Sequence, residues 1–287
     1  MKLLRHGPKG LARPGLLDAQ GQVRDLSALM PDITPATLSP AGLAALASVD
    51  LGTLPVVPQG ELQVPWSGMG KFICIGLNYS DHAAETGAPI PKEPIIFMKP
   101  NSAAVGCNHD VVLPQGSVKS DWEVELGIVI GSTARYVSEA DALKHVAGYC
   151  VVNDVSEREY QIERGGTWDK GKGCDTFGPV GPWMVTADEV GDPQNLSMWL
   201  EVNGHRWQNG STKTMIFGAA HLVSYVSRFM TLYPGDLITT GTPPGVGLGA
   251  KPNPVFLKPG DVMRLGIEKL GEQRQTVHAW DPALIDG

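Results

Sequence analysis

The apolar residues of this chain gather in short runs that are rich in β-branched side chains. Three such runs, Phe72–Gly76, Leu126–Ile130 and Ala147–Val152, are followed by polar or glycine-containing segments. Runs of this length and composition predict buried strands rather than amphipathic helices. We therefore expect a core that is built mainly from strands.

Helical patterns are confined to a few segments of the chain. The pair Ser39–Pro40 has the residue types of an N-cap and a first helical position, which predicts a helix that runs to Ser48. Apolar residues recur with helical spacing over 217–230, so we predict a second helix there. The segment 195–207 predicts a hairpin instead, because Asn203–Gly204 suits a type I′ turn.

Composition narrows the class of protein. The 35 glycines and 23 prolines indicate many turns, which favours a β-rich α/β fold over a helical bundle. No apolar run approaches the roughly 20 residues that span a bilayer, and Met1–Pro8 lacks the apolar stretch of a secretory signal. The net charge of −7 argues against nucleic-acid binding. The four cysteines have no paired short spacing, so we expect reduced thiols in a cytoplasmic protein that does not bind a membrane.

The chain is long enough, and at 42 % hydrophobic residues apolar enough, to form one large and one small unit. Gly15–Leu26 predicts two short strands around a glycine-containing turn, and the proline-rich stretch Pro55–Pro65 indicates a linker. None of these early residues suggests catalysis. We therefore expect a small N-terminal accessory domain at 1–67 and a catalytic domain at 68–287.

Three acidic residues stand at the ends of predicted strands. Glu123 and Glu125 share one face of a strand, about 6–7 Å apart along the chain, while Val124 faces the other side. Asp154 follows the run Ala147–Val152. Ionised carboxylates that enter a packed sheet repel one another, and a hard cation such as Mg²⁺, Mn²⁺ or Ca²⁺ removes that repulsion. The alternative is a solvated strand face that holds no metal.

Several short motifs of this chain resemble those of the fumarylacetoacetate hydrolase family. They occur in the family's order, over about residues 70–280. The matching pieces are Gly76–Tyr79, His82 and Glu85, Phe97–Pro100, Glu123–Glu125, Asn153–Asp154 with Arg158 and Gln161, Lys170–Lys172, Asp175–Pro179, Pro234–Asp236 and Thr240–Gly247.

The resemblance implies a mixed, β-rich α/β fold with rolled sheets around the site and a small N-terminal domain. It also implies that Glu123, Glu125 and Asp154 hold Mg²⁺, with Mn²⁺ or Ca²⁺ as alternatives. Three carboxylates leave open positions on an octahedral ion for water and substrate. The expected partner is a small 2-oxo acid, and the expected assembly is a homodimer.

His82 and Glu85 are three positions apart, so they share one face of a helix that Asn78 or Ser80 can cap. A solvated surface pair is one interpretation, because an acidic residue near a helix start also suits the helix dipole. The resemblance implies instead a dyad in which Glu85 orients His82, which then activates water. In the family this helix belongs to a lid that becomes ordered over the ligand, and Gly87 suits such a segment.

Two lysines are candidates for the site. Lys172, in the glycine-rich stretch Trp168–Gly173 that we interpret as a loop, aligns with the family's active-site lysine. Lys170 is the expected bystander. Lys99 ends a predicted strand, where it can be solvated or can reach the pocket as a cation.

Other candidates concern substrate binding. Asp154, Arg158 and Gln161 have the i, i+4, i+7 spacing of one helix face, where an exposed ion-paired face is the alternative to a substrate site. Arginine offers a planar fork for a carboxylate, so Arg158 is expected to orient the substrate. Thr242, in a Gly/Pro-rich loop, would present a hydroxyl and backbone amides to a carboxylate. The family motif adds Tyr79.

The chemistry that the resemblance implies is metal-assisted hydrolysis of a carbon–carbon bond in a 2,4-diketo acid. Water activated by His82 attacks one carbonyl, and Lys172 and the metal stabilise the pyruvate enolate that leaves. The start Met1–Arg5 resembles bacterial members that act on 2,4-diketo-3-deoxy sugar acids (rhamnonate or fuconate) and are often called ureidoglycolate lyases. We expect L-2,4-diketo-3-deoxyrhamnonate or a related acid to give pyruvate and a hydroxy acid such as lactate.

Three alternatives stay open at this point. The same residues suit decarboxylation, isomerisation or hydration of a 2-oxo acid, since all these reactions pass through an enolate. They also suit cleavage of ureidoglycolate. Outside enzymes, the chain could be a metal-bearing binding protein, a function that would not require the His82–Glu85 pair.

Overall fold

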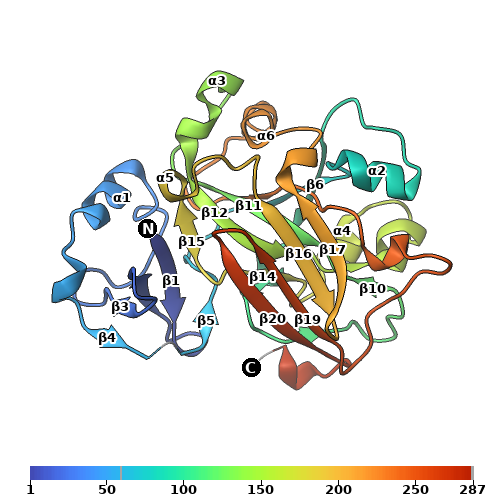
Figure 1. Cartoon of the computed structure of the whole chain (residues 1–287), viewed down its shortest axis with the longest axis horizontal. Coiled ribbons are helices and arrows are strands. Elements are labelled where there is room, and N and C mark those ends of the chain that lie inside the picture. The colour runs from blue at the N-terminus through green and yellow to red at the C-terminus, as the bar shows by residue number, and fades with distance from the viewer. Residues whose placement is uncertain (59, 286–287) are drawn as a thin grey trace.

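The protein is a β-rich α/β structure in which a 13-stranded sheet and a five-stranded sheet enclose the main core (Figure 1). The computed structural model describes residues 1–58 and 60–285. A separate two-stranded ribbon pairs β10 (Ser120–Asp121) with β13 (Ser156–Glu157). The predicted mixed, β-rich fold class is confirmed.

The strands of the two sheets run through most of the chain. In the large sheet they are β1 (Lys2–His6), β2 (Arg13–Leu17), β3 (Val23–Asp25), β4 (Val56–Val57), β5 (Leu62–Gln63), β6 (Phe72–Gly76), β7 (Ile95–Lys99), β8 (Ala104–Gly106), β11 (Val124–Ile130), β12 (Val146–Asn153), β14 (Gly178–Val180), β15 (Met184–Thr186) and β18 (Leu237–Thr239). In the five-stranded sheet they are β9 (Val111–Val112), β16 (Ser197–Val202), β17 (His205–Ser211), β19 (Val262–Ile267) and β20 (Gly271–His278).

The helices are short. The α-helices are α1 (Pro40–Ala47), α2 (Ser80–Thr86), α3 (Glu139–Ala142), α4 (Asp169–Lys172), α5 (Ala187–Val190) and α6 (Ala219–Val226). The other helical turns are η1 (Leu51–Thr53), η2 (Asn101–Ala103), η3 (Leu143–His145), the π-helix η4 (Glu159–Glu163), η5 (Thr212–Thr214), η6 (Gly247–Gly249) and η7 (Pro282–Leu284). Within the part of the chain that the structure describes, no helix has the length and apolar character needed to cross a membrane.

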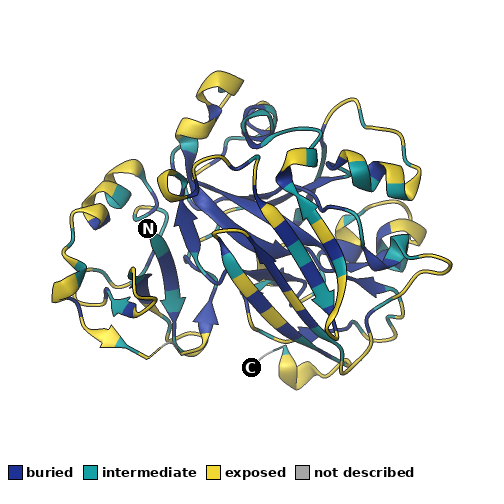
Figure 2. Ribbon diagram, in the orientation of Figure 1, coloured by how far each residue is buried: buried dark blue, intermediate teal, exposed yellow. Residues whose placement is uncertain are grey.

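Strand β11 lies at the centre of the large sheet, between β12 and β18. Its alternate residues Val124, Leu126 and Ile128 pack with β16 and β19 of the other sheet, whereas Val129 packs on the opposite side. Both faces of β11 are therefore buried, as the β-branched run predicts. Figure 2 shows buried residues along the central strands, with exposed residues on the helices, the loops and the outer side of the five-stranded sheet.

The N-terminal elements lie side by side at one end of the molecule (Figure 1). Strand β1 extends the large sheet, because it pairs antiparallel with β15 and places Leu3 opposite Met184. The interpretation of Pro55–Pro65 as a linker is wrong in part: β4 and β5 form there and pair with β3 and β1. These are short strands on the outside of the ladder, where proline is tolerated because no N–H is needed.

The predicted local elements form with some differences in length. Ser39 caps α1 by accepting a hydrogen bond from Gly42 N, as predicted. The turn Asn203–Gly204 has φ values of 52° and 78°, which a type I′ hairpin requires. The helix predicted over 217–230 covers only Ala219–Val226. Ser227 follows it, and its hydroxyl donates to Ser224 O and accepts from Val137 N, bonds that compete with further helix.

Candidate active site

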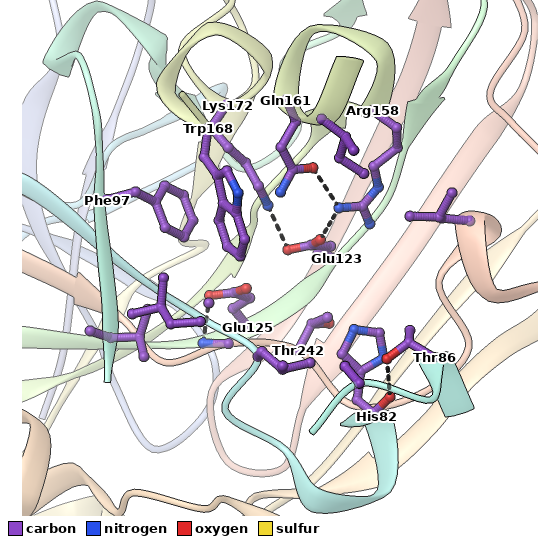
Figure 3. A pocket seen from close by; sticks show the side chains of 18 residues that line it. His82, Thr86, Phe97, Glu123, Glu125, Arg158, Gln161, Trp168, Lys172 and Thr242 are labelled. Carbon is purple, nitrogen blue, oxygen red and sulfur yellow. Dashed lines mark hydrogen bonds and ion pairs between the residues drawn. The ribbon is translucent and has the colours of Figure 1, made fainter. Parts of the chain in front are cut away.

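A cavity of about 300 Å³ opens where the ends of β6 and β11, helix α2, the π-helix η4, helix α4 and the loop after β18 meet. Figure 3 shows Lys172, Gln161 and Arg158 on one side of this cavity and His82 and Thr86 on the other, with Glu123 between them. Side chains that are far apart in the sequence are thus brought together. Every residue that lines the cavity lies between positions 75 and 248.

The three predicted metal ligands converge. Antiparallel pairing places Val124 opposite Asn153, and Asp154 N donates to Glu123 O at 2.9 Å, so Asp154 stands beside the start of β11. Carboxylate oxygens of Glu123, Glu125 and Asp154 all lie within 4.8 Å of one another, and all three residues are buried. A solvated strand face, the alternative that the sequence left open, does not fit this burial.

Three cations, Lys172, Arg158 and Lys99, surround these carboxylates. Lys172 Nζ lies 2.8 Å from both Glu123 Oε2 and Asp154 Oδ2. Arg158 Nη1 lies 2.7 Å from Glu123 Oε1. Burial alone would raise the pKa of the Glu123 carboxyl, but the charges of Lys172 and Arg158 outweigh it, so this pKa lies well below its usual range. Burial alone would lower the pKa of Lys172, and the charges of Asp154 and Glu123 raise it instead.

Glu125 differs from the other two carboxylates. Among residues 1–58 and 60–285, no lysine or arginine nitrogen lies within ion-pair distance of it, and its Oε2 accepts from Gly241 N at 2.9 Å. Burial, with the negative charges of Asp154 and Glu123, raises the pKa of this carboxyl well above its ordinary value. An added cation beside Glu125 would remove that electrostatic cost.

The donor set fits a divalent cation. The carboxylates are hard oxygen donors, which suit Mg²⁺ and Mn²⁺. Asp154 Oδ1 is buried and makes no hydrogen bond of good geometry; its close contact is an ion pair with Lys99 Nζ at 2.7 Å, and that ammonium also donates to the carbonyls of Val155 and Lys172. Glu125, a buried carboxylate without a lysine or arginine partner among the described residues, stands beside this oxygen, and a divalent ion between the two would complete the cluster.

His82 and Glu85 form the predicted pair. His82 Nδ1 lies 3.0 Å from Glu85 Oε2, and His82 faces the cavity. A carboxylate only accepts, so Nδ1 carries the hydrogen and Nε2 keeps its lone pair. The other Glu85 oxygen accepts from Gly245 N at 2.9 Å, which attaches α2 to the loop after β18. A solvated surface pair would not have this second hydrogen bond, from Gly245 N.

The predicted cap of helix α2 is wrong. Its N-cap is Tyr79, which makes no capping hydrogen bond. Asn78 instead lies fully buried, where its side chain donates to Thr240 O and Phe217 O and accepts from Phe217 N. The amide thus fixes the start of α2 to two other segments rather than to its own helix.

The helix predicted through Asp154, Arg158 and Gln161 is wrong, although all three side chains are buried near the site. Residues 156–157 form β13, and the π-helix begins only at Glu159. Pairing of β13 with β10 overrides the helical spacing. Arg158 and Gln161 nevertheless line the cavity, and Arg158 Nη1 donates to Gln161 Oε1 at 3.0 Å.

Asp121 is a residue of the site that the sequence interpretation missed. It holds Arg158, with Oδ2 2.8 Å from Nη2, and it accepts from Gly247 N at 2.7 Å and Leu248 N at 3.0 Å. Because Arg158 is held by Asp121 and Glu123 together, its predicted role in orienting a substrate carboxylate stays a prediction. The alternation Asp121, Glu123, Glu125 was the available signal, since it continues the same strand spacing.

The segment around Lys172 is helical, so the predicted loop at Trp168–Gly173 is wrong. Helix α4 spans Asp169–Lys172 and directs Lys172 into the site. Gly171 makes this possible, because a Cβ there would lie 2.2 Å from Glu157 O. Lys170 is on the exposed side and donates to Arg164 O, as expected for a bystander.

The remaining predicted residues take different places. Lys99 is buried behind Asp154 and Tyr79 is buried in the core, where its hydroxyl lies 3.3 Å from Met198 Sδ; neither lines the cavity. Burial raises the pKa of Tyr79 well above its usual value. Thr242 does line the cavity, but its hydroxyl donates to Val124 O and accepts from Gln208 Nε2. That hydroxyl is therefore not a free donor for a substrate.

Apolar side chains form much of the cavity wall, and no sequence motif pointed to them. Trp168 packs edge-on against Phe97, with ring centroids 5.3 Å apart. It also lies directly on Gly76, where a Cβ would be 2.2 Å from the ring. Glycine is thus required at position 76 for the indole to take this place.

The sequence of this chain matches known proteins over the segment that forms the cavity. Residues 71–278 match the family model described as fumarylacetoacetate (FAA) hydrolase, C-terminal. The chain belongs to the fumarylacetoacetate hydrolase family. Membership confirms the resemblance seen in the ordered motifs. The chain is also 63 % identical over 277 residues to a protein of Burkholderia lata provisionally named a hydrolase, covering 96 % of this chain and 98 % of the relative.

Solved structures of the fumarylacetoacetate hydrolase family share the whole fold. The fumarylacetoacetate hydrolase from Exiguobacterium antarcticum superposes with a TM-score of 0.85 at 35 % identity, covering 98 % of this chain and 100 % of that one. Maleylpyruvate hydrolase from Sphingobium sp. SYK-6, in complex with manganese(II) and pyruvate, superposes with a TM-score of 0.81 at 32 % identity and the same coverage. The protein is therefore an enzyme of this family with an acidic cluster suited to a divalent metal.

Hydrogen exchange can test whether α2 belongs to a lid. Few contacts attach it, among them the Glu85–Gly245 bond, and the loop beyond it exposes Ile90 by 61 %. We expect oxalate with Mg²⁺ to slow amide exchange over residues 80–92, whereas Mg²⁺ alone leaves it unchanged, since only the oxalate can join the lid to the ion. Strand β11 serves as the internal control, protected in every state. Equal protection of 80–92 in all states would show a preformed site without a lid.

Proposed function

We propose that the protein is a divalent-metal-dependent hydrolase that cleaves the carbon–carbon bond of a 2,4-diketo acid to give pyruvate and a second carboxylic acid. The observation that carries this proposal is the His82–Glu85 dyad, which faces the carboxylate cluster across one cavity. The relative in complex with manganese(II) and pyruvate supports the same pairing of ion and product.

Glu123, Glu125 and Asp154 would hold the ion, for which Mg²⁺ is our first choice. A bound Mg²⁺ or Mn²⁺ supplies a Lewis acid for the 2-oxo acid end of the substrate. The side chains around the ion carry out all other steps. The amide nitrogen of Gln161 has no protein partner among the described residues, so it can donate to a substrate oxygen.

His82 acts as the general base in this proposal. Its Nε2 takes a proton from water, and the hydroxide oxygen bonds to C4 of the substrate. The C3–C4 bond then breaks, its electron pair forms the enolate of pyruvate, and the proton that His82 received passes to C3, which restores the neutral histidine. The acyl part leaves as a carboxylic acid. Glu85 stabilises the imidazolium of His82, and the Lys172 ammonium stabilises the negative charge on the enolate.

The dyad favours hydrolysis over decarboxylation or isomerisation of a 2-oxo acid, because those two reactions need the enolate but no attack by water. A histidine oriented by a carboxylate is an arrangement that activates water. Hydration of a 2-oxo acid also uses attack by water and stays an alternative. Ureidoglycolate cleavage has no feature of the cavity in its favour.

Labelled water tests the proposal. Acetylpyruvate with Mg²⁺ in H₂¹⁸O is expected to give pyruvate and acetate, with ¹⁸O from solvent in the acetate carboxylate, because the attacking oxygen comes from water. Mass spectrometry of the acetate and a coupled assay for pyruvate measure both products, and protein in EDTA is the control. Higher kcat/KM for oxaloacetate decarboxylation or for glyoxylate release from ureidoglycolate would contradict the assignment.

The residues that line the cavity also suggest how the chain divides into an accessory and a catalytic unit. We propose residues 1–67 as an accessory unit and 68–287 as the catalytic unit, since the cavity is lined only from Ile75 onward. The homodimer that the family implies stays a prediction. The deoxy sugar acid expected from the resemblance would find few free polar side chains in the cavity.

A further inference from the structure

We infer that the cavity takes a 2,4-diketo acid with an uncharged, apolar acyl tail, in preference to one with a second carboxylate or a hydroxylated tail. This inference rests on the proposed function and deepens it by naming the class of substrate. It rests on the side chains that line the cavity but have no role at the 2-oxo acid end of the substrate.

The charged side chains of the cavity are already paired. Arg158 contacts Asp121, Glu123 and Gln161, and Lys172 contacts Glu123 and Asp154. No other lysine or arginine lines the cavity within the described part of the chain. A second carboxylate on the tail would therefore be removed from water without a cation of its own, which is costly.

The hydroxyl groups of the cavity are committed as well. Thr242 Oγ1 donates to Val124 O, and the single hydroxyl hydrogen of Thr86 is shared between the carbonyls of His82 and Ala83. Among the described side chains that line the cavity, the amide of Gln161 and the indole N–H of Trp168 are the uncharged donors without a protein partner, and we assign the amide to the reacting end. A tail with several hydroxyls would find too few partners, and each buried hydroxyl without one weakens binding.

The rest of the wall is apolar and firmly placed. Its members are Ile75, Leu77, Ile95, Phe97, Ile162, Trp168 and Leu248. Trp168 is fixed between Gly76 and Phe97, and Leu248 is positioned by the two backbone hydrogen bonds that Asp121 accepts. An alkyl or aryl tail would bury its surface against these side chains without breaking any hydrogen bond.

Ile162 is a specificity-determining residue in this view. It lines the cavity from the π-helix η4 while 53 % of it is exposed. Its neighbours Glu163 and Arg164 are charged, and Ile162 is the residue of this turn that lines the cavity, so an apolar tail would bury its exposed surface. Because Ile162 lies at the rim of the cavity, a longer side chain at this position can be introduced without disturbing the core.

A matched set of substrates tests the inference in the Mg²⁺-loaded protein. Acetylpyruvate has the shortest tail and serves as the reference for the reaction itself. Butyrylpyruvate, succinylpyruvate and 2,4-diketo-3-deoxyrhamnonate then compare an alkyl, a carboxylate and a hydroxylated tail. We expect kcat/KM for butyrylpyruvate to exceed that for each of the other two by at least about tenfold, the usual discrimination of an apolar pocket.

A cation at the rim should reverse part of this preference. We expect Ile162→Arg to raise the ratio of kcat/KM for succinylpyruvate over butyrylpyruvate by at least about tenfold, because the tail carboxylate gains a partner. Ile162→Gln, which adds polarity without charge, should lower kcat/KM for butyrylpyruvate only. Glu163→Gln adds the same unit of charge at a neighbour that does not line the cavity, and should leave the ratio unchanged.

The outcomes separate the two proposals. Cleavage of acetylpyruvate with a preference for succinylpyruvate or the deoxy sugar acid over butyrylpyruvate would overturn this inference and leave the hydrolase intact. An unchanged ratio in Ile162→Arg would remove Ile162 as the specificity residue. No cleavage of any member, acetylpyruvate included, would overturn the proposed function and the inference with it.

Discussion

Replacing Glu125 with glutamine is expected to weaken Mn²⁺ and Mg²⁺ binding at least about a hundredfold, since loss of even an indirect partner of a metal site costs about 10–100-fold. Hydrolysis should fall with it. Glu125 is the best residue for this test because no lysine or arginine of the described chain pairs with it, so Glu125→Gln takes no partner from a buried cation. The glutamine oxygen can still accept from Gly241 N.

The stability of the metal-free variant provides a second readout. Neutralising Glu125 removes repulsion from Asp154 and Glu123. The Tm of the metal-free Glu125→Gln variant should therefore equal or exceed the Tm of the metal-free wild type. Glu123→Gln would instead leave Lys172 and Arg158 short of a partner, a change that destabilises by about 3–5 kcal/mol when a buried pair is broken. Mn²⁺ titration followed by electron paramagnetic resonance measures binding, with the exposed Glu272→Gln as control. Unchanged Mn²⁺ affinity in Glu125→Gln would contradict the ligand assignment.

Replacing His82 with alanine is expected to lower kcat by about 10²–10⁴-fold, the range for loss of a general base. Metal affinity should be retained, because His82 belongs to helix α2 and pairs with Glu85 rather than with the carboxylate cluster. Steady-state kinetics with acetylpyruvate and Mn²⁺ titration measure the two quantities separately. A variant with most of the wild-type kcat would show that water is activated elsewhere.

Glu85→Gln distinguishes the two roles of its carboxylate. The glutamine oxygen can replace either acceptor, for Gly245 N or for the His82 Nδ1–H, but not both. We expect a smaller loss of kcat than in His82→Ala. Equal kinetics in Glu85→Gln and the wild type would reduce Glu85 to a structural residue.

Local patterns predicted the elements that carry the acidic cluster. The β-branched runs before and after the carboxylates form β11 and β12, and the alternation of Glu123, Val124 and Glu125 separates the carboxylate face from the core face. These features depend only on the geometry of one strand, in which successive side chains point to opposite sides. The family motifs added the pairing of His82 with Glu85, which the helix brings into contact.

Pairing between strands overrode local spacing elsewhere. The helical spacing from Asp154 to Gln161 predicted a continuous helix, but residues 156–157 form a strand that pairs with residues 120–121. The glycines around Lys172 indicated a loop, yet Gly171 lets helix α4 approach Glu157 O more closely than a Cβ would permit. In both cases the partner segment lies far away in the sequence, so no local pattern could reveal it.

The sequence by itself determined which residues could hold a metal, which helix carries the histidine, and that the core is made of strands. Only the tertiary structure decided that Asp121 holds Arg158, that Lys99 and Tyr79 lie outside the cavity, and that Trp168 and Ile162 form its wall. The physical reason is that side-chain direction follows from the backbone of a single segment. The shape and polarity of a cavity instead follow from the register and packing of several segments, which non-local hydrogen bonds and core contacts fix.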